Sequence, residues 1–260
     1  MLRELLIDES ILPDLAEICG IHAGDGYLRN DGRRRDLDIS GGFEEKEYYD
    51  SHVIPLCEKV FSTSITGRYF NSRNTYGFVI RDEEIVNFML SLGFPNGKKT
   101  LTVKAPDFVI HSRNLDIIYR FIRGVFDTDG CLNFRKREGS NYAKCDKLKH
   151  SYPRIQISSC STYLIDDLAD LLKRTGFQFR QCYDKTKLEN YNDKFKIYLR
   201  GYQNLENWMF NIGSKNTSKL SRFNVWQKFG FCPPNTTFEQ RTQILNNELD
   251  PNVFYNGPII

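Results

Sequence analysis

Two aspartates end two similar heptapeptides, and carboxylates paired in this way could bind a metal ion. Residues 20–26 read GIHAGDG and residues 124–130 read GVFDTDG, so Asp25 aligns with Asp129 without a gap. Each aspartate is predicted to lie at the C-terminal end of a helix, where the helix dipole is already negative. A pair of carboxylates there needs a cation, and hard Mg²⁺ suits carboxylate and carbonyl oxygens. The pattern predicts metal-assisted hydrolysis of a phosphodiester.

Small residues recur on one face of each predicted motif helix. Gly20 and Gly24 lie four residues apart, as do Gly124 and Thr128. Small residues at this spacing let two helix backbones approach each other closely. We therefore expect the two motif helices to pack together and to bring the two aspartates into one site.

Simpler interpretations of these residues are weaker. Asp-Gly is a common turn dipeptide, but two aligned copies on glycine-faced helices favour a site. A calcium loop starting at Asp127 fails because Leu132 stands where that loop needs glycine. Zinc is not expected, because Cys145, His150 and Cys160 do not form the close ligand pairs typical of zinc sites.

The similarity continues beyond the motifs, which indicates an internal duplication. NFMLSLG at 87–93 matches NWMFNIG at 207–213 with an offset of 120, and DIS at 38–40 matches QIS at 156–158. Three matches in the same order are unlike chance, and they predict two copies of one structural unit.

Each half is predicted to follow the order αββαββα, which gives an α+β fold with two antiparallel sheets. The predicted helices are residues 13–23, 43–60, 83–92, 114–126, 161–174 and 203–211. The predicted domains are a first lobe at 1–112, a second lobe at 113–230 and a C-terminal extension at 231–260 that contains a short helical piece.

Composition limits the class of protein. Of 260 residues, 40% are hydrophobic, which is enough for a buried core, and the net charge is only +3, so anion binding must come from local clusters. Seven cysteines without a C-x-x-C pair predict free thiols in a reducing, cytoplasmic environment. The sequence predicts neither a secretory signal nor a membrane-spanning segment.

CGIHAGDGYL and RGVFDTDGCL resemble the two motifs of the LAGLIDADG homing endonucleases, and the likeness extends over roughly residues 10–230. The resemblance implies the single-chain, archaeal-like, intron-encoded type, with motif helices at the lobe interface and two saddle-shaped sheets about a pseudo-twofold axis. It implies a monomeric enzyme that makes a staggered double-strand break in a long, asymmetric double-stranded DNA target.

The resemblance also implies roles for particular residues. Asp25 and Asp129 would bind Mg²⁺, or Mn²⁺ in its place, with help from the backbone carbonyls of Gly24 and Thr128. The first motif departs from the family, because HA at 22–23 replaces more typical apolar and acidic residues.

A basic residue near each metal ion is a further implication. GKKTLTVKAPDF at 97–108 resembles the Lys-before-Pro segment that precedes second motifs, and it points to Lys104, with Lys98 as the alternative. In the second half, GSKNTSK contains Lys215 and Lys219, of which we favour Lys215. Ordinary solvation is the competing explanation for each lysine.

Strand alternation places basic and amide side chains on the sheet faces that point away from the core. Such side chains read base edges and bind phosphates, and a two-stranded ribbon fits a major groove. The predicted DNA contacts are Tyr27, Arg29, Arg33, Arg34, Arg35, Asp38, Ser40, Thr66, Arg68, Arg73, Asn133, Arg135, Arg137, Arg154, Gln156, Ser158, Gln178, Arg180, Lys194 and Lys196. A basic insertion at 136–150 lengthens only the second hairpin, and we expect it to add phosphate contacts.

Two alternatives of other classes stay open. The same scaffold could be a non-cleaving binder, either an RNA maturase that acts on intron RNA or a DNA-binding regulator, although both motif aspartates are intact. An intein fragment is the other alternative; a first residue Met and a final GPII without recognisable splicing-junction residues favour a free-standing enzyme.

Overall fold

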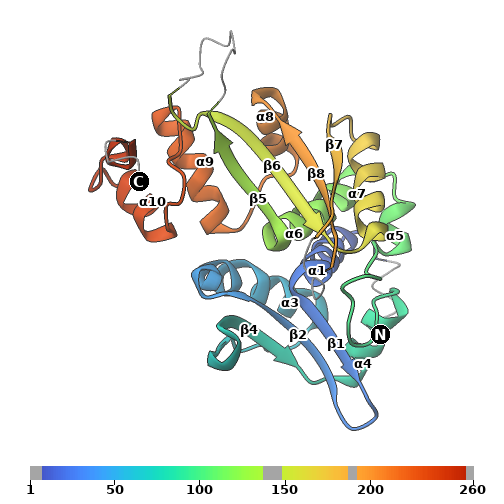
Figure 1. The fold of residues 1–260 in the computed structure, drawn as a ribbon. Coiled ribbons are helices and arrows are strands. Elements are labelled where there is room, and N and C mark those ends of the chain that lie inside the picture. Colours follow the sequence, from blue (N-terminus) through green and yellow to red (C-terminus); the bar gives the residue numbers. More distant parts are fainter. Residues whose placement is uncertain (1–7, 137–147, 187–191, 256–260) are drawn as a thin grey trace.

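Two long helices lie side by side at the centre of the molecule (Figure 1). The computed structural model describes residues 8–136, 148–186 and 192–255. The central helices are α1 (Leu12–Asp25) and α6 (Leu115–Asp129), and each runs directly into the first strand of a sheet. They confirm the predicted motif helices and extend each of them to its aspartate.

Two sheets with the same strand order lie on opposite sides of the helix pair (Figure 1). The first contains β1 (Gly26–Asn30), β2 (Arg35–Gly42), β4 (Thr75–Ile80) and β3 (Arg68–Phe70), in the order β1-β2-β4-β3. The second contains β5 (Gly130–Arg135), β6 (Tyr152–Ser159), β8 (Lys194–Arg200) and β7 (Arg180–Asp184), in the order β5-β6-β8-β7. All neighbouring strands are antiparallel, which confirms the predicted α+β fold of duplicated lobes.

Further helices pack on these sheets. α4 (Glu83–Ser91) contacts β1 and β2, while α7 (Thr162–Arg174) and α8 (Tyr202–Asn211) contact β6 and β8. The inward-facing apolar residues alternate along the strands as predicted: Leu28, Leu37, Ile39, Leu132, Ile155, Ile157, Ile197 and Leu199 are all buried. Within the part of the chain that the structure describes, no helix is both long and apolar enough to cross a membrane.

The helix predicted at 43–60 is interrupted. It consists of a 3₁₀ turn η2 (Phe43–Glu45), α2 (Lys46–Tyr48), a π turn η3 (Tyr49–Val53) and α3 (Ile54–Phe61). Pro55 has no N–H to donate to the carbonyl four residues earlier, so an unbroken α-helix through this segment is not available.

Helix α9 (Thr217–Phe229) was not predicted. Its sequence, TSKLSRFNVWQKF, shows no continuous apolar stripe, so periodicity gives no signal for it. α10 (Phe238–Leu245) corresponds to the helical piece predicted in the C-terminal extension, and it packs against α9. The remaining short elements are η4 (Asn71–Arg73), α5 (Asp107–Ile110) and η5 (Pro251–Tyr255).

Glycines set the distance between α1 and α6. A Cβ added at Gly20 would lie 2.2 Å from the carbonyl oxygen of Phe121, and one at Gly124 would lie 2.4 Å from that of Glu17. Both distances are far below van der Waals contact, so only glycine permits this approach. The predicted packing of the motif helices is confirmed.

A buried ion pair also joins the two helices. Arg123 Nε lies 2.9 Å from Glu17 Oε1, and His52 Nε2 lies 2.7 Å from the same oxygen. Burial alone would raise the pKa of Glu17, but hydrogen bonds from His52 and Arg123 hold it at about 2. A charged carboxylate is therefore kept at the interface between the halves.

Candidate active site and nucleic-acid interface

The motif aspartates lie at the adjoining ends of α1 and α6. A Cβ added at Gly24 would lie 2.0 Å from Thr128 Oγ1 and 3.4 Å from Asp129 Cγ, so the last turns of the two helices are in contact. Burial, the charge of Glu45 and the charge of Asp129 together raise the pKa of Asp25, so the two motif carboxylates are close enough to interact. The structure thus brings together the two carboxylates that the sequence motif singled out.

Lys99 closes the end of α1. Its Nζ donates to the carbonyl oxygens of His22 (2.6 Å), Ala23 (2.7 Å) and Gly24 (2.5 Å). An ammonium group here neutralises the negative end of the helix dipole. Burial lowers the pKa of Lys99 to about 8, although the charges of Asp129 and Asp25 oppose this shift.

Lys219 closes the end of α6 in the same way. Its Nζ donates to the carbonyl oxygens of Phe126 (2.7 Å), Asp127 (2.6 Å) and Thr128 (2.9 Å). Burial lowers the pKa of Lys219, against the opposing charge of Asp127 and the other nearby carboxylates. Each half therefore places one lysine on three successive carbonyls at the end of its motif helix.

The lysines at the ends of the motif helices are thus not the predicted Lys104 and Lys215. Lys104 is exposed and lies 3.6 Å from Asp107, while the exposed Lys215 approaches the motif through its backbone N–H, which donates to Asp127 Oδ2 at 2.7 Å. Lys98, the alternative in the first half, is also exposed. The duplication carried the missing signal, because Lys99 and Lys219 are separated by the same 120 residues as the matching heptapeptides before them.

The Asp25 side of the site contains a second carboxylate, which the sequence did not single out. Tyr49 Oη donates to Asp25 Oδ2 at 2.8 Å. A Cβ at Gly41 would lie 2.5 Å from Glu45 Oε2 and 2.8 Å from Asp25 Oδ2, so both carboxylates border this glycine. Burial, followed by the charges of Glu45 and Asp129, raises the pKa of Asp25 to about 7.

The Asp129 side is more open and more basic. A cavity of about 280 Å³ is lined by Ala23, Gly24, Lys99, Thr100, Val103, Asp129, Ser158, Ser159, Cys160 and Lys194. One face of Asp129 is open to solvent, but desolvation by the surrounding protein still raises its pKa, with Lys99 and Lys219 acting in the opposite direction. The two sides of the site therefore differ in both space and charge.

Asn216 connects the two lobes beside the site. Its Nδ2 donates to Glu45 Oε1 at 2.6 Å and to the carbonyl of Asp127 at 2.8 Å. The Asp127 carboxylate accepts from Ser214 Oγ at 2.5 Å and so holds the loop that leads to α9. Asp127 thus has a structural role, and burial raises its pKa to about 6.

The donor groups fit a hard divalent cation. Among the described residues, no three His, Cys, Asp or Glu side chains converge closely enough to form a metal cluster by themselves. An ion here would be held by Asp25 or Asp129 together with backbone carbonyls and water. Carboxylate and carbonyl oxygens are the donors that Mg²⁺ and Mn²⁺ prefer, and the carbonyls of Gly24 and Thr128, which already accept from ammonium groups, each keep one lone pair for a cation.

Many of the predicted DNA contacts lie in register on the strand faces away from the core. Tyr27 is opposite Asp38, Asn133 is opposite Arg154, and Arg154 Nε donates to Asn133 Oδ1 at 3.1 Å. Five of the described contacts lie outside the strands: Arg33 and Arg34 are in the turn between β1 and β2, Thr66 and Gln178 precede β3 and β7, and Arg73 is in η4. Arg137 and most of the 136–150 insertion fall outside the described residues.

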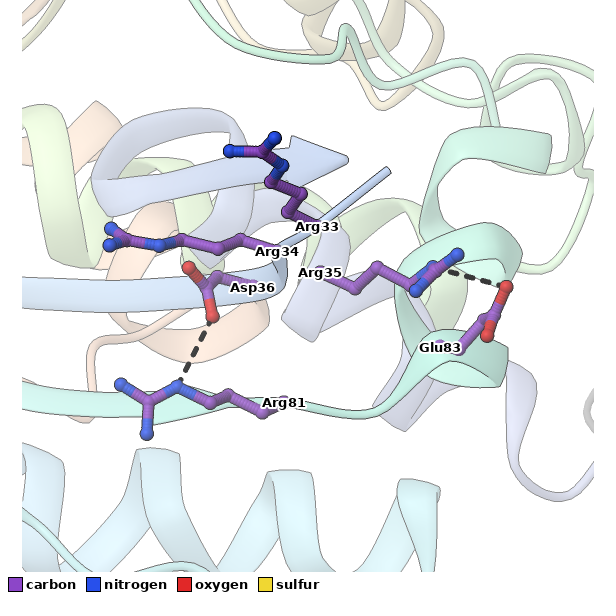
Figure 2. Close-up of a pocket in the computed structure, with 6 residues that line it drawn as sticks. All are labelled: Arg33, Arg34, Arg35, Asp36, Arg81 and Glu83. Carbon is purple, nitrogen blue, oxygen red and sulfur yellow. Dashed lines mark hydrogen bonds and ion pairs between the residues drawn. The ribbon is translucent and has the colours of Figure 1, made fainter. Parts of the chain in front are cut away.

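The tip of the β1–β2 hairpin forms an open basic pocket of about 520 Å³ (Figure 2). Arg35 Nε lies 3.1 Å from Glu83 and Arg81 Nε donates to Asp36 at 3.3 Å. Figure 2 shows that Arg33 and Arg34 extend past these pairs, and neither has an interaction drawn to the other pocket residues. Arg81 adds a basic residue that the sequence reasoning did not include.

Comparison with known proteins defines the class of fold. No protein-family model matches the chain. Variants of the homing endonuclease I-DmoI superpose with a TM-score of 0.54 at 14% identity, covering 78% of this chain and 92% of that one. I-DmoI in complex with DNA and Mn gives a TM-score of 0.53 at 14% identity (78% and 97%), and an I-SmaMI mutant gives 0.50 at 11% identity (94% and 97%). The chain has the LAGLIDADG homing endonuclease fold.

One curated sequence relative is much longer than this chain. It is a probable translation initiation factor IF-2 from Methanocaldococcus jannaschii, 23% identical over 172 residues. The match covers 63% of this chain and only 13% of that protein.

Proposed function

We propose that the protein is a site-specific DNA endonuclease that cuts both strands of a long, asymmetric double-stranded target and leaves a staggered break. The observation that carries the proposal is the repeated arrangement at the ends of α1 and α6. Each helix ends in one aspartate, and one lysine covers the last three carbonyls before it. Two such ends in contact provide one set of groups for each DNA strand.

The chemistry follows from these groups. A divalent cation held by Asp25 or Asp129 with the adjacent carbonyls would supply a Lewis acid and a more acidic bound water. Lys99 and Lys219 place positive charge where the attacked phosphate gains negative charge. Because its three N–H groups donate to the carbonyls of His22, Ala23 and Gly24, Lys99 acts as a fixed positive charge, and burial of that charge lowers its pKa to about 8.

The asymmetric target follows from unequal halves. The Asp25 side contains Glu45 and Tyr49, whereas the Asp129 side opens into a cavity that holds Ser158 and Lys194. The polar faces of the two sheets also differ position by position, with Tyr27 opposite Asp38 in one and Cys131 opposite Gln156 in the other. We propose that a monomer reads a different sequence with each lobe.

Selection of cleaved sites from a randomised DNA library in Mg²⁺ tests the proposal. We expect one long consensus sequence that is cut on both strands. We expect the rate of double-strand cleavage to fall by at least about 100-fold in Asp25→Asn and in Asp129→Asn, because each substitution removes a metal ligand. Affinity measured in Ca²⁺ and circular dichroism serve as controls for binding and folding. Wild-type cleavage by both variants would contradict the metal assignment, while specific binding without cleavage would favour a DNA-binding regulator or, with intron RNA, a maturase.

The match to a much longer protein favours an endonuclease that is encoded within a host protein over a free-standing one. A match confined to 13% of a much longer protein is what an endonuclease domain embedded in a host protein, as in an intein, would give. The mass of the product expressed from the complete reading frame would decide between an embedded domain and a free-standing enzyme.

A further inference from the structure

Arg241 reaches from the C-terminal extension into the first turn of α9. It is only 1% exposed. Its Nε donates to Ser221 Oγ at 2.7 Å, its Nη2 lies 3.2 Å from both the carbonyl oxygen and Oγ of Ser218, and its Nη1 donates to the carbonyl of Thr236. The guanidinium therefore joins the turn before α10 to the turn of α9 that carries Lys219.

The acceptors around this buried cation are neutral. Within the described part of the chain, no carboxylate forms an ion pair with Arg241, and burial followed by the charge of Arg222 lowers its pKa to about 10. A buried charge without a counterion is costly unless its donors are satisfied. Ser218 and Ser221 provide most of the acceptors. The buried guanidinium of Arg241 is therefore satisfied only while the start of α9 is in place.

The same turn is held on its opposite side by the active site. Asn216 caps α9 by accepting from the N–H of Ser218 at 3.1 Å and of Lys219 at 3.4 Å. Its amide donates across the lobe interface to Glu45. Ser218 and its neighbour Lys219 thus lie between two anchors, the N-cap at the site and Arg241 in the extension.

We propose that Arg241 is a positioning residue for Lys219, and that the C-terminal segment 231–255 acts as a brace that holds Lys219 against the last carbonyls of α6. This inference rests on the proposed nuclease function. The first half offers a comparison, because the Lys99 loop is anchored within its own lobe by the N–H of Gly97, which donates to the carbonyl of Leu28 at 2.7 Å. The brace should therefore act on the Lys219 half of the site alone.

Single-turnover cleavage of the selected DNA site tests the brace. We expect Arg241→Met to slow cleavage by about 10-fold or more, with Arg241→Lys intermediate and DNA affinity in Ca²⁺ within about twofold of wild type. Lys228→Met is the matched control, because Lys228 Nζ bonds the Leu245 carbonyl and Asn247 Oδ1 at the far end of the same α9–α10 contact. Combining Arg241→Met with Lys219→Met should add no further loss, since both act through one group. Additive losses, or equal losses in Lys228→Met, would overturn the proposal in favour of general destabilisation.

Hydrogen exchange separates failure of the brace from failure of the nuclease. In Arg241→Met without DNA or metal, we expect faster amide exchange across 217–222 and unchanged exchange across 97–103. If wild type cuts no DNA yet this exchange pattern is found, the proposed nuclease is wrong while the structural brace is supported. Unchanged exchange across 217–222 would refute the brace whatever the cleavage activity.

Discussion

Asp25 and Asp129 occupy equivalent places in the duplication but have different surroundings. Asp25 accepts from Tyr49 and lies beside Glu45, so it is a crowded carboxylate with a pKa of about 7. Asp129 faces a cavity with Lys99 and Lys194; desolvation still raises its pKa, but the charges of Lys99, Lys219 and Lys194 oppose that shift. Without a bound cation, the ionised carboxylate of Asp25 should therefore lower the stability of the folded protein at high pH more than that of Asp129 does.

This gives a residue-scale prediction that needs no DNA. The folded pKa of Asp25 lies above its ordinary value of 3.8, so ionisation of Asp25 lowers stability as pH rises from about 4 to about 7, and the cost is complete above 7. In EDTA, Asp25→Asn should raise Tm by roughly 3–8 °C at pH 8 and leave it nearly unchanged at pH 4.

Thermal melts of both proteins at the two pH values check this. Asp127→Asn serves as a contrast: burial raises the pKa of Asp127 as well, but this carboxylate accepts from both Ser214 and the N–H of Lys215, and loss of these hydrogen bonds should destabilise the protein. Millimolar Mg²⁺ should stabilise wild type more than Asp25→Asn. A Tm gap that is the same at pH 4 and pH 8 would show that Asp25 does not titrate as described.

Residues of the site could be predicted where the sequence repeats itself, and they could not be predicted where it does not. The aspartates belong to aligned heptapeptides, and the lysines were recoverable from the 120-residue offset that relates Lys99 to Lys219. Glu45 and Tyr49 gave no such signal, since they reach the site only because η2 and η3 break a helix that appeared continuous.

At the scale of elements, the contact between α1 and α6 determines the geometry of the site. Both glycines at the crossing face carbonyl oxygens of the partner helix, so any side chain there must separate the helices. Separation would move Gly24 away from Thr128 and pull the two aspartates apart. The sequence predicted this contact correctly because small residues at a spacing of four have few other uses on two matching helices.

We predict that Gly20→Ala lowers the free energy of unfolding by about 1–3 kcal/mol, because its methyl group would lie 2.2 Å from the Phe121 carbonyl oxygen. Gly42→Ala is the matched control: it adds the same methyl group where the nearest atom, Glu45 Oε2, is 3.9 Å away. Urea denaturation of both variants measures the difference. Equal stability of the two would mean that the helices do not approach as closely as the structure shows.

Helix α9 shows what local pattern cannot predict. It lacks an apolar stripe because its contacts are distributed: Trp226 Nε1 donates to the carbonyl of Ser151, Lys219 reaches α6, and Ser221 accepts from Arg241. Each partner lies far away in sequence, so the helix is specified by tertiary contacts rather than by periodicity.

At the scale of the whole molecule, the net charge is small, and the basic residues are concentrated in particular places. The net charge is only +3, yet arginines and lysines gather on the described strand faces of both lobes and at the tip of the β1–β2 hairpin. Many of them are paired, as Arg29 is with Asp31 and Arg73 with Asp38. Phosphate binding must therefore depend on the basic residues whose charge is not already used within the protein.

Arg34 at the tip of the β1–β2 hairpin forms no ion pair with the described residues, so it allows a matched test of the DNA-binding surface. The logarithm of the DNA association constant should fall steeply with the logarithm of salt concentration, because each phosphate contact releases condensed counterions. Arg34→Gln should reduce this slope by about one unit, and Lys173→Gln, which removes an exposed charge from α7 on the helical side of the second sheet, should leave the slope unchanged. The association constants can be measured by fluorescence anisotropy between 50 and 200 mM salt, with Ca²⁺ present to prevent cleavage. A change of about one unit in the slope can be resolved over this range. Equal slopes for wild type, Arg34→Gln and Lys173→Gln would place the hairpin tip outside the DNA contact, and the basic pocket of Figure 2 would then be an ordinary solvated surface.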